Sequence, residues 1–188
     1  MKLYLVRHGE SVANHYARHA GWGQTPLSAQ GEKDAVEAGR KIKGLSFDRV
    51  YVSDLLRAKQ TRMIALPGAE ARETPLLREM SVGILSGMTK KDCEESYGEK
   101  YTRARTVKDY RPFGGETKEM QRMRLEQFLK QIEEENLSSV IAFTHEGILR
   151  RMLEKTGVEK ENPTPIPNGS VFLFEKDGGE WRFIKEAL

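Results

Sequence analysis

The sequence predicts an α/β fold with a mostly parallel sheet between two layers of helices. Short apolar and β-branched runs alternate along the chain with longer segments of helical periodicity, and the usual order is strand and then helix. Units of this kind join parallel strands by right-handed crossovers and place helices on both faces of the sheet. At 188 residues the chain is long enough to bury a proper core. We therefore expect a three-layer architecture in one domain, residues 1–188.

Each strand and helix is expected from a local pattern. The strands are apolar or β-branched runs bounded by turn residues, at residues 2–6, 48–52, 71–74, 139–143, 170–176 and 181–185. The helices are expected at residues 11–18, 28–43, 53–65, 89–98, 99–109, 117–135 and 147–155. Ser28 and Ser53 are the expected N-caps, because a serine hydroxyl accepts a hydrogen bond from first-turn backbone N–H groups.

The longest expected helix follows Thr117. Its apolar residues recur at helical spacing and would form one buried face: Met120, Met123, Leu125, Phe128, Leu129 and Ile132. Further along, the proline-rich residues 162–167 are expected to form a loop that leads into a final hairpin, whose turn is formed by residues 177–180.

Residues 80–116 interrupt the alternation of strand and helix, and we expect them to fold over the strand ends as a partial lid. Side chains of this segment could form an aromatic and cationic wall for the organic part of a substrate: Met88, Tyr97, Tyr101, Arg103, Arg105, Tyr110, Arg111 and Phe113. The alternative is two amphipathic helices whose aromatic residues pack inward.

Composition excludes several classes of protein. The chain has 31 basic and 28 acidic residues, a net charge of +3, and the two signs are interspersed. This is an ordinary solvated surface, so we expect no nucleic-acid partner. The single cysteine excludes an internal disulfide and a zinc site built from several cysteines. The first apolar run is too short for a signal peptide or a membrane span, which favours a cytoplasmic protein with no membrane partner. An edge strand fits a monomer and a dimer equally, so the oligomeric state stays open.

Residues 6–10, Val-Arg-His-Gly-Glu, lie at the end of the first expected strand. A histidine beside an arginine and before a glycine at this place suits an imidazole that attacks a bound phosphate. Two other segments repeat the arrangement of strand, polar residue and helix start. One leads from the strand at 48–52 to Arg57, and the other from the strand at 139–143 to His145.

Ligands of open α/β sheets bind beyond the carboxyl ends of the strands. Arg7, His8, Arg57 and His145 are therefore expected to face one small dianion, although they are far apart in the sequence. Helices that begin there would add backbone N–H groups and partial positive charge. Taken singly, each residue has a structural alternative: Arg57 as a solvated surface residue, for example, or His145 as a turn histidine bonded to backbone. The ordered set favours the phosphate site.

At these positions the chain resembles the histidine phosphatase superfamily, which has the phosphoglycerate mutase-like fold. The resemblance rests on motifs in the family's order: Leu5 to Ser11 with Asn14, Trp22 to Ser28 with Gly31, Ser53 to Ala58 with Gln60 and Thr61, Leu77 to Glu79, and Thr144 to Gly147. It points to a small phosphatase branch with α-ribazole phosphatase-like and broad-specificity members. Two departures stand out. Glu146 occupies a place where the family often has a second glycine, and residues 82–87 lack the aromatic and acidic residues common in that loop.

The resemblance implies a role for each matching residue. His8 would be the nucleophile that becomes a phosphohistidine, and Arg7, Arg57 and His145 would clamp the phosphate. Glu79 would be the general acid and base, although taken singly it fits an ordinary surface glutamate. The partner that binds this site as substrate would be a small phosphorylated metabolite.

The residue types fit phosphoryl transfer, which needs an in-line nucleophile, charge stabilisation and a proton for the leaving oxygen. A histidine attacks only through an unprotonated ring nitrogen, and like-charge repulsion from Arg7 and Arg57 should disfavour the imidazolium form of His8. Arginine also binds two phosphate oxygens at once through its planar fork. His145 would help most as a cation, and Glu79 would protonate the leaving oxygen and later deprotonate water.

Further contacts are expected from the segment that follows the first histidine. Asn14 resembles a supporting phosphate ligand of the family, with an ordinary first-turn polar residue as the alternative. In the loop at residues 21–27, Gln24 or Thr25 is expected to face the substrate, while Trp22 is expected to anchor the loop.

Neither a metal nor a cofactor is expected. His15 and His19 have the i, i+4 spacing of metal ligands, but no third ligand is apparent, and a solvated helix face is the better interpretation. The proposed chemistry needs neither group.

The sequence is compatible with three functions. The first is metal-independent hydrolysis of a small phosphomonoester through a phosphohistidine on His8. The second is a phosphoglycerate mutase-type transfer, which must return the phosphoryl group to a bound acceptor. Mutases of the family carry longer lid and tail segments, whereas this chain ends at Leu188 just after its last strand, so hydrolysis is favoured. The third is a catalytically silent binding relative. Its mark would be loss of a catalytic residue, but all of those implied are present.

Overall fold

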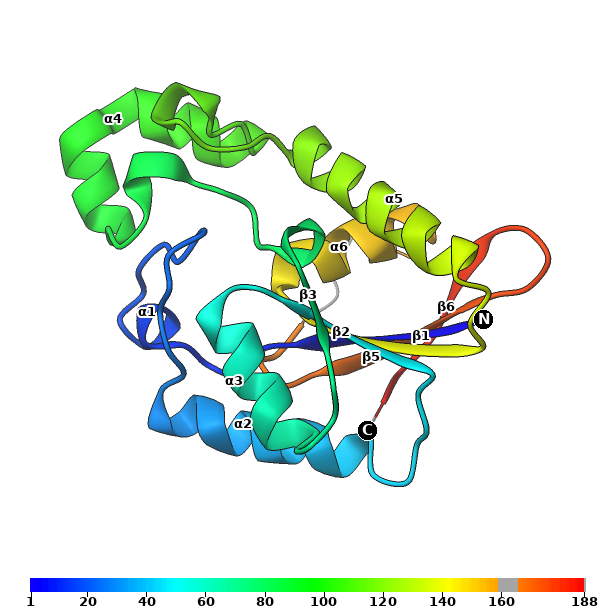
Figure 1. Ribbon diagram of the computed structural model, residues 1–188. Helices are drawn as coiled ribbons and strands as arrows, with labels where there is room; N and C mark the ends of the chain where they lie inside the picture. Colours follow the sequence, from blue (N-terminus) through cyan, green and yellow to red (C-terminus); the bar gives the residue numbers. More distant parts are fainter. Residues whose placement is uncertain (159–165, 188) are drawn as a thin grey trace.

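A six-stranded sheet in the order β3-β2-β4-β1-β5-β6 forms the centre of the protein (Figure 1). The computed structural model describes residues 1–158 and 166–187. The strands are β1 (Lys2–Arg7), β2 (Arg49–Ser53), β3 (Arg72–Thr74), β4 (Ser139–Thr144), β5 (Val171–Lys176) and β6 (Trp181–Ala187). β1 to β4 pair in parallel, whereas β5 runs antiparallel to both of its neighbours, β1 and β6. The predicted α/β fold with a mostly parallel sheet is confirmed.

Helices cover both faces of this sheet. The α-helices are α1 (Val12–His15), α2 (Ala29–Lys41), α3 (Leu56–Ala65), α4 (Lys90–Val107), α5 (Lys118–Glu134) and α6 (Glu146–Lys155), and single 3₁₀ turns occur at η1 (Pro75–Leu77), η2 (Gly83–Leu85) and η3 (Arg111–Phe113). In Figure 1, α2 and α3 lie on one side of the sheet and α5 and α6 on the other. α4 lies beyond the strand ends, away from both layers.

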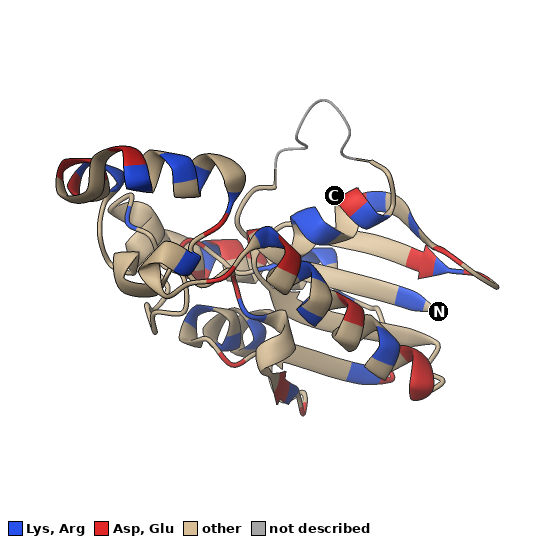
Figure 2. Ribbon diagram, turned by 90° about the horizontal axis from the view of Figure 1, so that it is seen from above, with Lys and Arg blue, Asp and Glu red and all other residues tan. Residues whose placement is uncertain are grey.

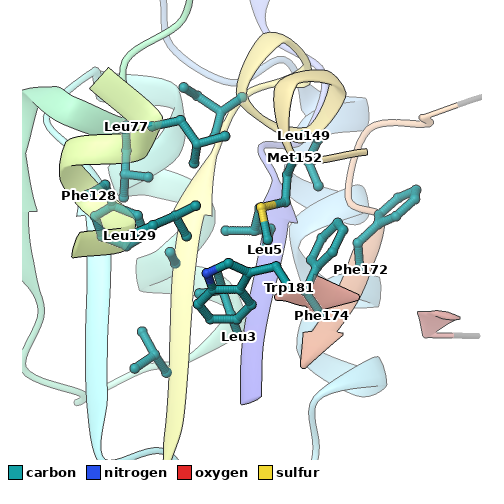
Figure 3. Packing of buried hydrophobic residues seen from close by; sticks show 14 of the residues in the cluster. Leu3, Leu5, Leu77, Phe128, Leu129, Leu149, Met152, Phe172, Phe174 and Trp181 are labelled. Carbon is teal, nitrogen blue, oxygen red and sulfur yellow. The ribbon is translucent and has the colours of Figure 1, made fainter. Parts of the chain in front are cut away.

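Alternate residues of the central strands face the two helical layers. Leu3 and Leu5 of β1 belong to the core that includes α5 and α6, shown in Figure 3, whereas Tyr4 and Val6 pack with α2 and α3. This follows from the two-residue period of a strand, and it explains why residues 3–6 of β1 are all apolar rather than alternating with polar residues. Burial of each such side chain contributes about 1.5–3 kcal/mol.

The α5 helix begins and packs largely as the sequence predicts. The hydroxyl of its N-cap, Thr117, accepts a hydrogen bond from the backbone N–H of Met120. The buried face comprises Gln121, Leu125, Phe128, Leu129 and Ile132. The expected positions of Met120 and Met123 in the core are wrong, because these side chains are 43% and 55% exposed. Their place on the inner face is taken by the polar Gln121.

Two helix starts or ends differ from expectation. α1 ends at His15 instead of continuing to residue 18, because Ala17 adopts a left-handed conformation, with φ of 50°. α3 begins at Leu56, since Ser53 still belongs to β2 and the N-cap is Leu55. The prediction that Ser53 is the N-cap of this helix is therefore wrong. Its hydroxyl contacts His145 instead. Ser28 caps α2 as predicted, accepting a hydrogen bond from the Gly31 N–H.

The segment 80–116 has a small core of its own. Val82, Leu85, Cys93, Tyr101 and Phe113 are among its buried members. The two helices expected at 89–98 and 99–109 meet within α4 at Gly98, whose φ of 48° and ψ of −127° break the helical geometry. This segment therefore keeps its shape through its own contacts.

Both signs of charge occur on most of the described helices and strands. Figure 2 shows Lys and Arg interspersed with Asp and Glu along the helices and strands. Among the described helices, none has both the length and the apolar character that a membrane crossing requires. The expected hairpin is present as β5 and β6, and residues 162–165 of the proline-rich loop lie outside the described residues.

Candidate active site

Three neighbouring parallel strands bring the predicted site residues together. β4 lies between β1 and β2 in the sheet, and Arg7 at the end of β1 pairs in register with Thr144 at the end of β4. His8 and His145 follow these two residues directly, and their ring centroids are 5.0 Å apart. Arg57 reaches the same point from the first turn of α3, which follows β2. The expected convergence of distant segments at the strand ends is therefore observed.

His8 is held as a neutral imidazole with a defined tautomer. The residue is 4% exposed, and Nδ1 lies 2.6 Å from the carbonyl oxygen of Gly9, so Nδ1 carries the hydrogen and donates it. Nε2 is then unprotonated, and it accepts a hydrogen bond from Nε of Arg57 at 3.2 Å. Burial lowers the pKa of His8 well below its usual value, and the positive charges of Arg57 and Arg7 lower it further. Nε2 therefore keeps its lone pair at neutral pH. In the ligand-free protein that lone pair accepts from Arg57, so the guanidinium must turn toward a bound anion before Nε2 is free.

Arg57 is fully buried, and all three guanidinium nitrogens have partners. Besides His8, it donates to the carbonyl oxygens of Gly23 and Gly21 at 3.1 and 3.0 Å. Burial lowers its pKa to about 10, so it remains charged at neutral pH. These contacts fix the fork of the guanidinium beside the histidine ring.

His145 is fully buried, and its Nε2 lies 2.8 Å from the hydroxyl of Ser53. Its Nδ1 is a buried atom for which the described residues provide no hydrogen-bond partner. Burial lowers the pKa of His145 well below its usual value, and Arg57 and His8 add to the effect. The ring is therefore neutral in the ligand-free protein, and the cationic form expected for it would require a bound dianion.

Arg7 shares its charge with a carboxylate that also lines the site. One of its terminal nitrogens lies 3.0 Å from Oε2 of Glu146, and another donates to the carbonyl oxygen of Ile166. Glu146 also pairs with Arg150 at 2.6 Å, one turn further along α6. Sequence reasoning had noted Glu146 only as a departure from the family and had given it no role.

Glu79 is fixed by hydrogen bonds from three different segments. Its Oε1 accepts from the backbone N–H of Met80 at 2.7 Å and from Nε2 of Gln121 at 3.1 Å, and its Oε2 accepts from the backbone N–H of Gly147 at 3.2 Å. A Cβ at Gly147 would lie 2.2 Å from Oε1 of Glu79, so only glycine fits here without displacement. The carboxyl group is thereby aimed into the site.

Arg7, His8, Arg57 and Glu79 line one cavity of about 510 Å³. The fully buried His145 lies behind His8 and is not among the lining residues. Eight cationic residues contribute to its wall, against the carboxylates of Glu79 and Glu146: Arg7, Arg57, Arg150 and Arg151 near the strand ends, and Arg18, Lys90, Arg105 and Lys108 near the lid. The cations on the lid side are close enough to affect one another. Burial lowers the pKa of Lys108, and Arg105 lowers it further. The cavity is therefore suited to anions.

The structure does not bring two predicted contact residues to the cavity. Oε1 of Gln24 accepts a hydrogen bond from the backbone N–H of Leu56 at 2.8 Å, and Oγ1 of Thr25 accepts one from that of Ala13 at 3.1 Å. Both side chains thus satisfy helix N-termini, and their expected orientation toward a substrate is wrong. Asn14 does line the cavity, while its Oδ1 accepts the backbone N–H of Ser11.

The predicted lid wall is corrected for most of its members. The aromatic residues Tyr101, Tyr110 and Phe113 are buried in the core of the segment, as the amphipathic alternative proposed. Met88 and Tyr97 pack against that core, and the exposed Arg103 and Arg111 do not line the cavity. Only Arg105 and Tyr110 of the expected wall reach it.

Two residues near this wall have contacts that connect segments. Trp22 donates from Nε1 to the carbonyl oxygen of Glu79 at 2.7 Å, and the guanidinium of Arg78 lies over its ring. Trp22 thus ties its loop to the glutamate segment. His19 lies past the end of α1 and contacts the hydroxyl of Tyr101 at 2.7 Å, so its expected place on a solvated helix face is wrong. His15 is exposed beside Glu10.

Sequence reasoning missed Gln121, Ser53 and the cations Lys90 and Lys108 as cavity or site residues. The sequence does contain a signal for Gln121, because it is a polar residue on an otherwise apolar helical face. Within residues 1–158 and 166–187, no cluster of three or more His, Cys, Asp or Glu residues is arranged to hold a metal ion.

Comparison with known proteins places this geometry in a family context. The family model of the histidine phosphatase superfamily (branch 1) matches residues 3–187. A 2,3-bisphosphoglycerate-dependent phosphoglycerate mutase of Parvibaculum lavamentivorans is 36% identical over 200 residues, covering 99% of this chain and 95% of that protein. Fructose-2,6-bisphosphatase TIGAR B of Danio rerio is 38% identical over 137 residues, which cover 69% of this chain but only 52% of that protein.

A solved structure extends the likeness to the whole fold. The structure comes from Escherichia coli, and its protein is provisionally named an alpha-ribazole-5'-P phosphatase. The TM-score is 0.87 at 26% sequence identity, and the match covers 98% of this chain and 95% of that one.

Proposed function

The chain belongs to the histidine phosphatase superfamily, and we propose that within it the protein hydrolyses a small phosphomonoester through a phosphohistidine on His8. One observation carries the proposal. The unprotonated Nε2 of His8 lies beside Arg57 at the wall of a cation-lined cavity that also holds Glu79. Phosphoryl transfer requires a nucleophile, positive charge that binds the phosphate, and a proton donor. His8, Arg57 and Glu79 would supply these three parts.

In the first step, Nε2 of His8 attacks phosphorus and the bond from phosphorus to the leaving oxygen breaks. Glu79 gives its proton to that oxygen, which departs as an alcohol. Arg7 and Arg57 stabilise the charge on the equatorial oxygens. His145 donates a hydrogen bond to one of them from Nδ1, for which the described residues provide no partner.

In the second step, water attacks the phosphohistidine. The bond between phosphorus and Nε2 breaks and its electron pair returns to the imidazole, while Glu79 takes a proton from the water. Phosphate then leaves, and both His8 and Glu79 are back in their starting forms.

The cavity wall also supports a class of substrate. Four of the cations on the wall are paired with carboxylates: Arg7 and Arg150 with Glu146, Arg151 with Glu154, and Arg105 with Glu94. Arg18, Lys90 and Lys108 add positive charge beyond the phosphate clamp, which favours a small metabolite that carries a further anionic group. Such a metabolite, rather than a nucleic acid or a membrane, is the proposed partner, and the proposed location is the cytoplasm. A screen of phosphorylated metabolites should find the highest kcat/KM for a substrate with two anionic groups. If phosphomonoesters with a neutral organic part and those with an anionic one had equal kcat/KM, this preference would be contradicted.

A mutase reaction is the second candidate. It is supported by the phosphoglycerate mutase of Parvibaculum lavamentivorans, which this chain matches over 95% of that protein's length. Because the two proteins match over nearly their whole lengths, chain length does not separate hydrolysis from transfer. A mutase would use the same phosphohistidine and return the phosphoryl group to a bound hydroxyl instead of water.

Acid-labile labelling of the enzyme tests the proposal. We expect rapid quenching during turnover to trap a phosphorylated enzyme in the wild type and none in His8→Ala, with phosphate as the product and no dependence on added metal. His15→Ala, at an exposed histidine, is the matched control and should behave as wild type. Phosphoryl exchange between phosphoglycerates without phosphate release would establish the mutase instead. Absence of both labelling and turnover would indicate a silent binding relative.

A further inference from the structure

Gln121 is a fully buried polar residue on the inner face of α5, and it lines the cavity beside Glu79. The other buried residues of this helix are Leu125, Phe128, Leu129 and Ile132, all apolar. Packing therefore does not require an amide at this position, and its polar atoms need a separate explanation.

The amide nitrogen of Gln121 has a clear partner. Nε2 donates to Oε1 of Glu79 at 3.1 Å, and the backbone N–H of Met80 donates to the same oxygen at 2.7 Å. Two donors occupy both lone pairs of Oε1. Oε2 accepts only from the backbone N–H of Gly147 among the described residues, so it keeps a lone pair for a proton. The exchangeable proton of Glu79 is thereby confined to Oε2.

The amide oxygen of Gln121 has no such partner. It is a buried acceptor for which the described residues provide no hydrogen bond. A Cβ at Gly147 would lie 2.9 Å from this oxygen and 2.4 Å from Nε2, so the absence of a side chain at Gly147 leaves the amide uncovered on that side. An unpaired buried acceptor is costly, and its place beside the general base indicates a partner that arrives with the reaction.

We propose that Gln121 selects water over an alcohol as the acceptor of the phosphoryl group. This inference rests on the proposed phosphohistidine mechanism. In the second step, the attacking water points one hydrogen at Oε2 of Glu79 and the other at the amide oxygen of Gln121. Hydrogen bonds of about 2.8 Å allow one water to bridge acceptors roughly 5 Å apart, and the amide nitrogen is already in contact with the carboxyl group.

The selection follows from counting hydrogens. Water has two, so it satisfies both acceptors. Its proton on the carboxylate side passes to Glu79, the bond between phosphorus and Nε2 of His8 breaks, and the second hydrogen stays on the oxygen that becomes part of hydrogen phosphate. An alcohol has a single hydroxyl hydrogen, which Glu79 must take. The amide oxygen of Gln121 then stays unpaired, so transfer to an alcohol is disfavoured relative to hydrolysis.

Partitioning of the phosphoenzyme between water and glycerol tests this directly. With p-nitrophenyl phosphate as donor, the ratio of glycerol phosphate to inorganic phosphate reports only the second step, whatever the rate of the first. Gln121→Met removes the acceptor at similar length, and we expect the ratio to rise roughly tenfold, equivalent to about 1.4 kcal/mol. Gln121→Glu keeps an acceptor oxygen, so its ratio should stay within about twofold of wild type even though its turnover falls.

Gln127→Met is the matched control, because it makes the same change on the exposed side of the same helix and should leave ratio and rate unchanged. An unchanged ratio in Gln121→Met, or an equal rise in Gln121→Glu, overturns the inference. If circular dichroism shows Gln121→Met unfolded, Gln121→Asn withdraws the acceptor and must raise the ratio. A wild type that prefers glycerol to water overturns the inference but leaves the phosphohistidine in place, whereas failure of labelling at His8 removes the proposed function itself.

Discussion

The neutral state of His8 is due chiefly to its burial. The sequence suggested that Arg7 and Arg57 would disfavour its protonation, and both do lower its pKa, but the largest effect is loss of solvent around the ring. The hydrogen bond from Nδ1 to the Gly9 carbonyl then decides which nitrogen keeps its lone pair. Charge and tautomer are therefore set by different neighbours.

Replacement of Arg57 by lysine tests how much the guanidinium fork matters. Arg57 binds His8 and two loop carbonyls at once, and a lysine ammonium cannot reproduce that planar arrangement. We expect Arg57→Lys to lower kcat/KM by about 100-fold. Arg62 lies on the same helix and donates to the Ala69 carbonyl oxygen instead. Arg62→Lys is therefore the control and should leave the steady-state kinetics unchanged. Similar losses in both variants would mean that α3 is simply intolerant of lysine.

At the level of elements, α5 holds the segment that carries Glu79. Arg124 donates to the carbonyl oxygens of Arg78 and Glu79 at 2.9 and 3.3 Å, and it also pairs with Glu116 at 2.8 Å. Glu116 in turn accepts the backbone N–H of Ser81 at 2.9 Å. This largely buried ion pair connects the start and end of the lid segment to the helix that bears Gln121.

Breaking this pair should destabilise the fold and the site together. We expect Arg124→Met to lower the free energy of unfolding by about 3 kcal/mol, because Glu116 would keep a buried charge without its partner, and to lower kcat as well. Urea denaturation and steady-state kinetics measure the two effects. Arg122→Met, which breaks an exposed pair with Glu119 on the same helix, is the control and should change neither. A stable and fully active Arg124→Met would rule out this role.

At the level of the whole molecule, the cavity lies where the three-layer core meets the segment 80–116, which has a core of its own. The lid docks on the loop after α1 through backbone contacts such as His19 N–H to the Met88 carbonyl and Gly87 N–H to the His19 carbonyl. Two histidines, His8 and His145, are buried at this junction without charge.

Burial of these two histidines makes the stability of the whole protein depend on pH. The pKa of each is lowered well below the ordinary value in the folded protein, so below about pH 6.5 the unfolded chain binds protons that the folded chain does not. Stability is therefore complete above about pH 6.5 and falls as pH decreases, by about 1.4 kcal/mol per histidine for each pH unit.

Urea denaturation between about pH 7 and pH 5 measures this loss. The double variant His8→Gln, His145→Gln should show a much shallower decline over the same range, since it lacks both groups. Equal slopes in the two proteins would show that other groups control the acid sensitivity.

The sequence by itself determined the strands, most of the helices and the chemical character of the site. Periodicity is a local property, so apolar runs such as residues 2–6 reveal a strand without knowledge of its neighbours. His8, Arg57 and His145 were also found from local patterns, because parallel strands bring their carboxyl ends to one edge whatever their order.

Only the tertiary structure decided what each polar side chain faces. Gln24 and Thr25 turned out to satisfy helix N–H groups, and Gln121 to bind Glu79, because such partners lie 32, 12 and 42 residues away in the chain. The position of β4 between β1 and β2 likewise depends on which surfaces pack against each other and exclude water. The same holds for the packing of the aromatic residues in segment 80–116. Hydrogen bonds and burial are properties of assembled surfaces, and no local pattern specifies them.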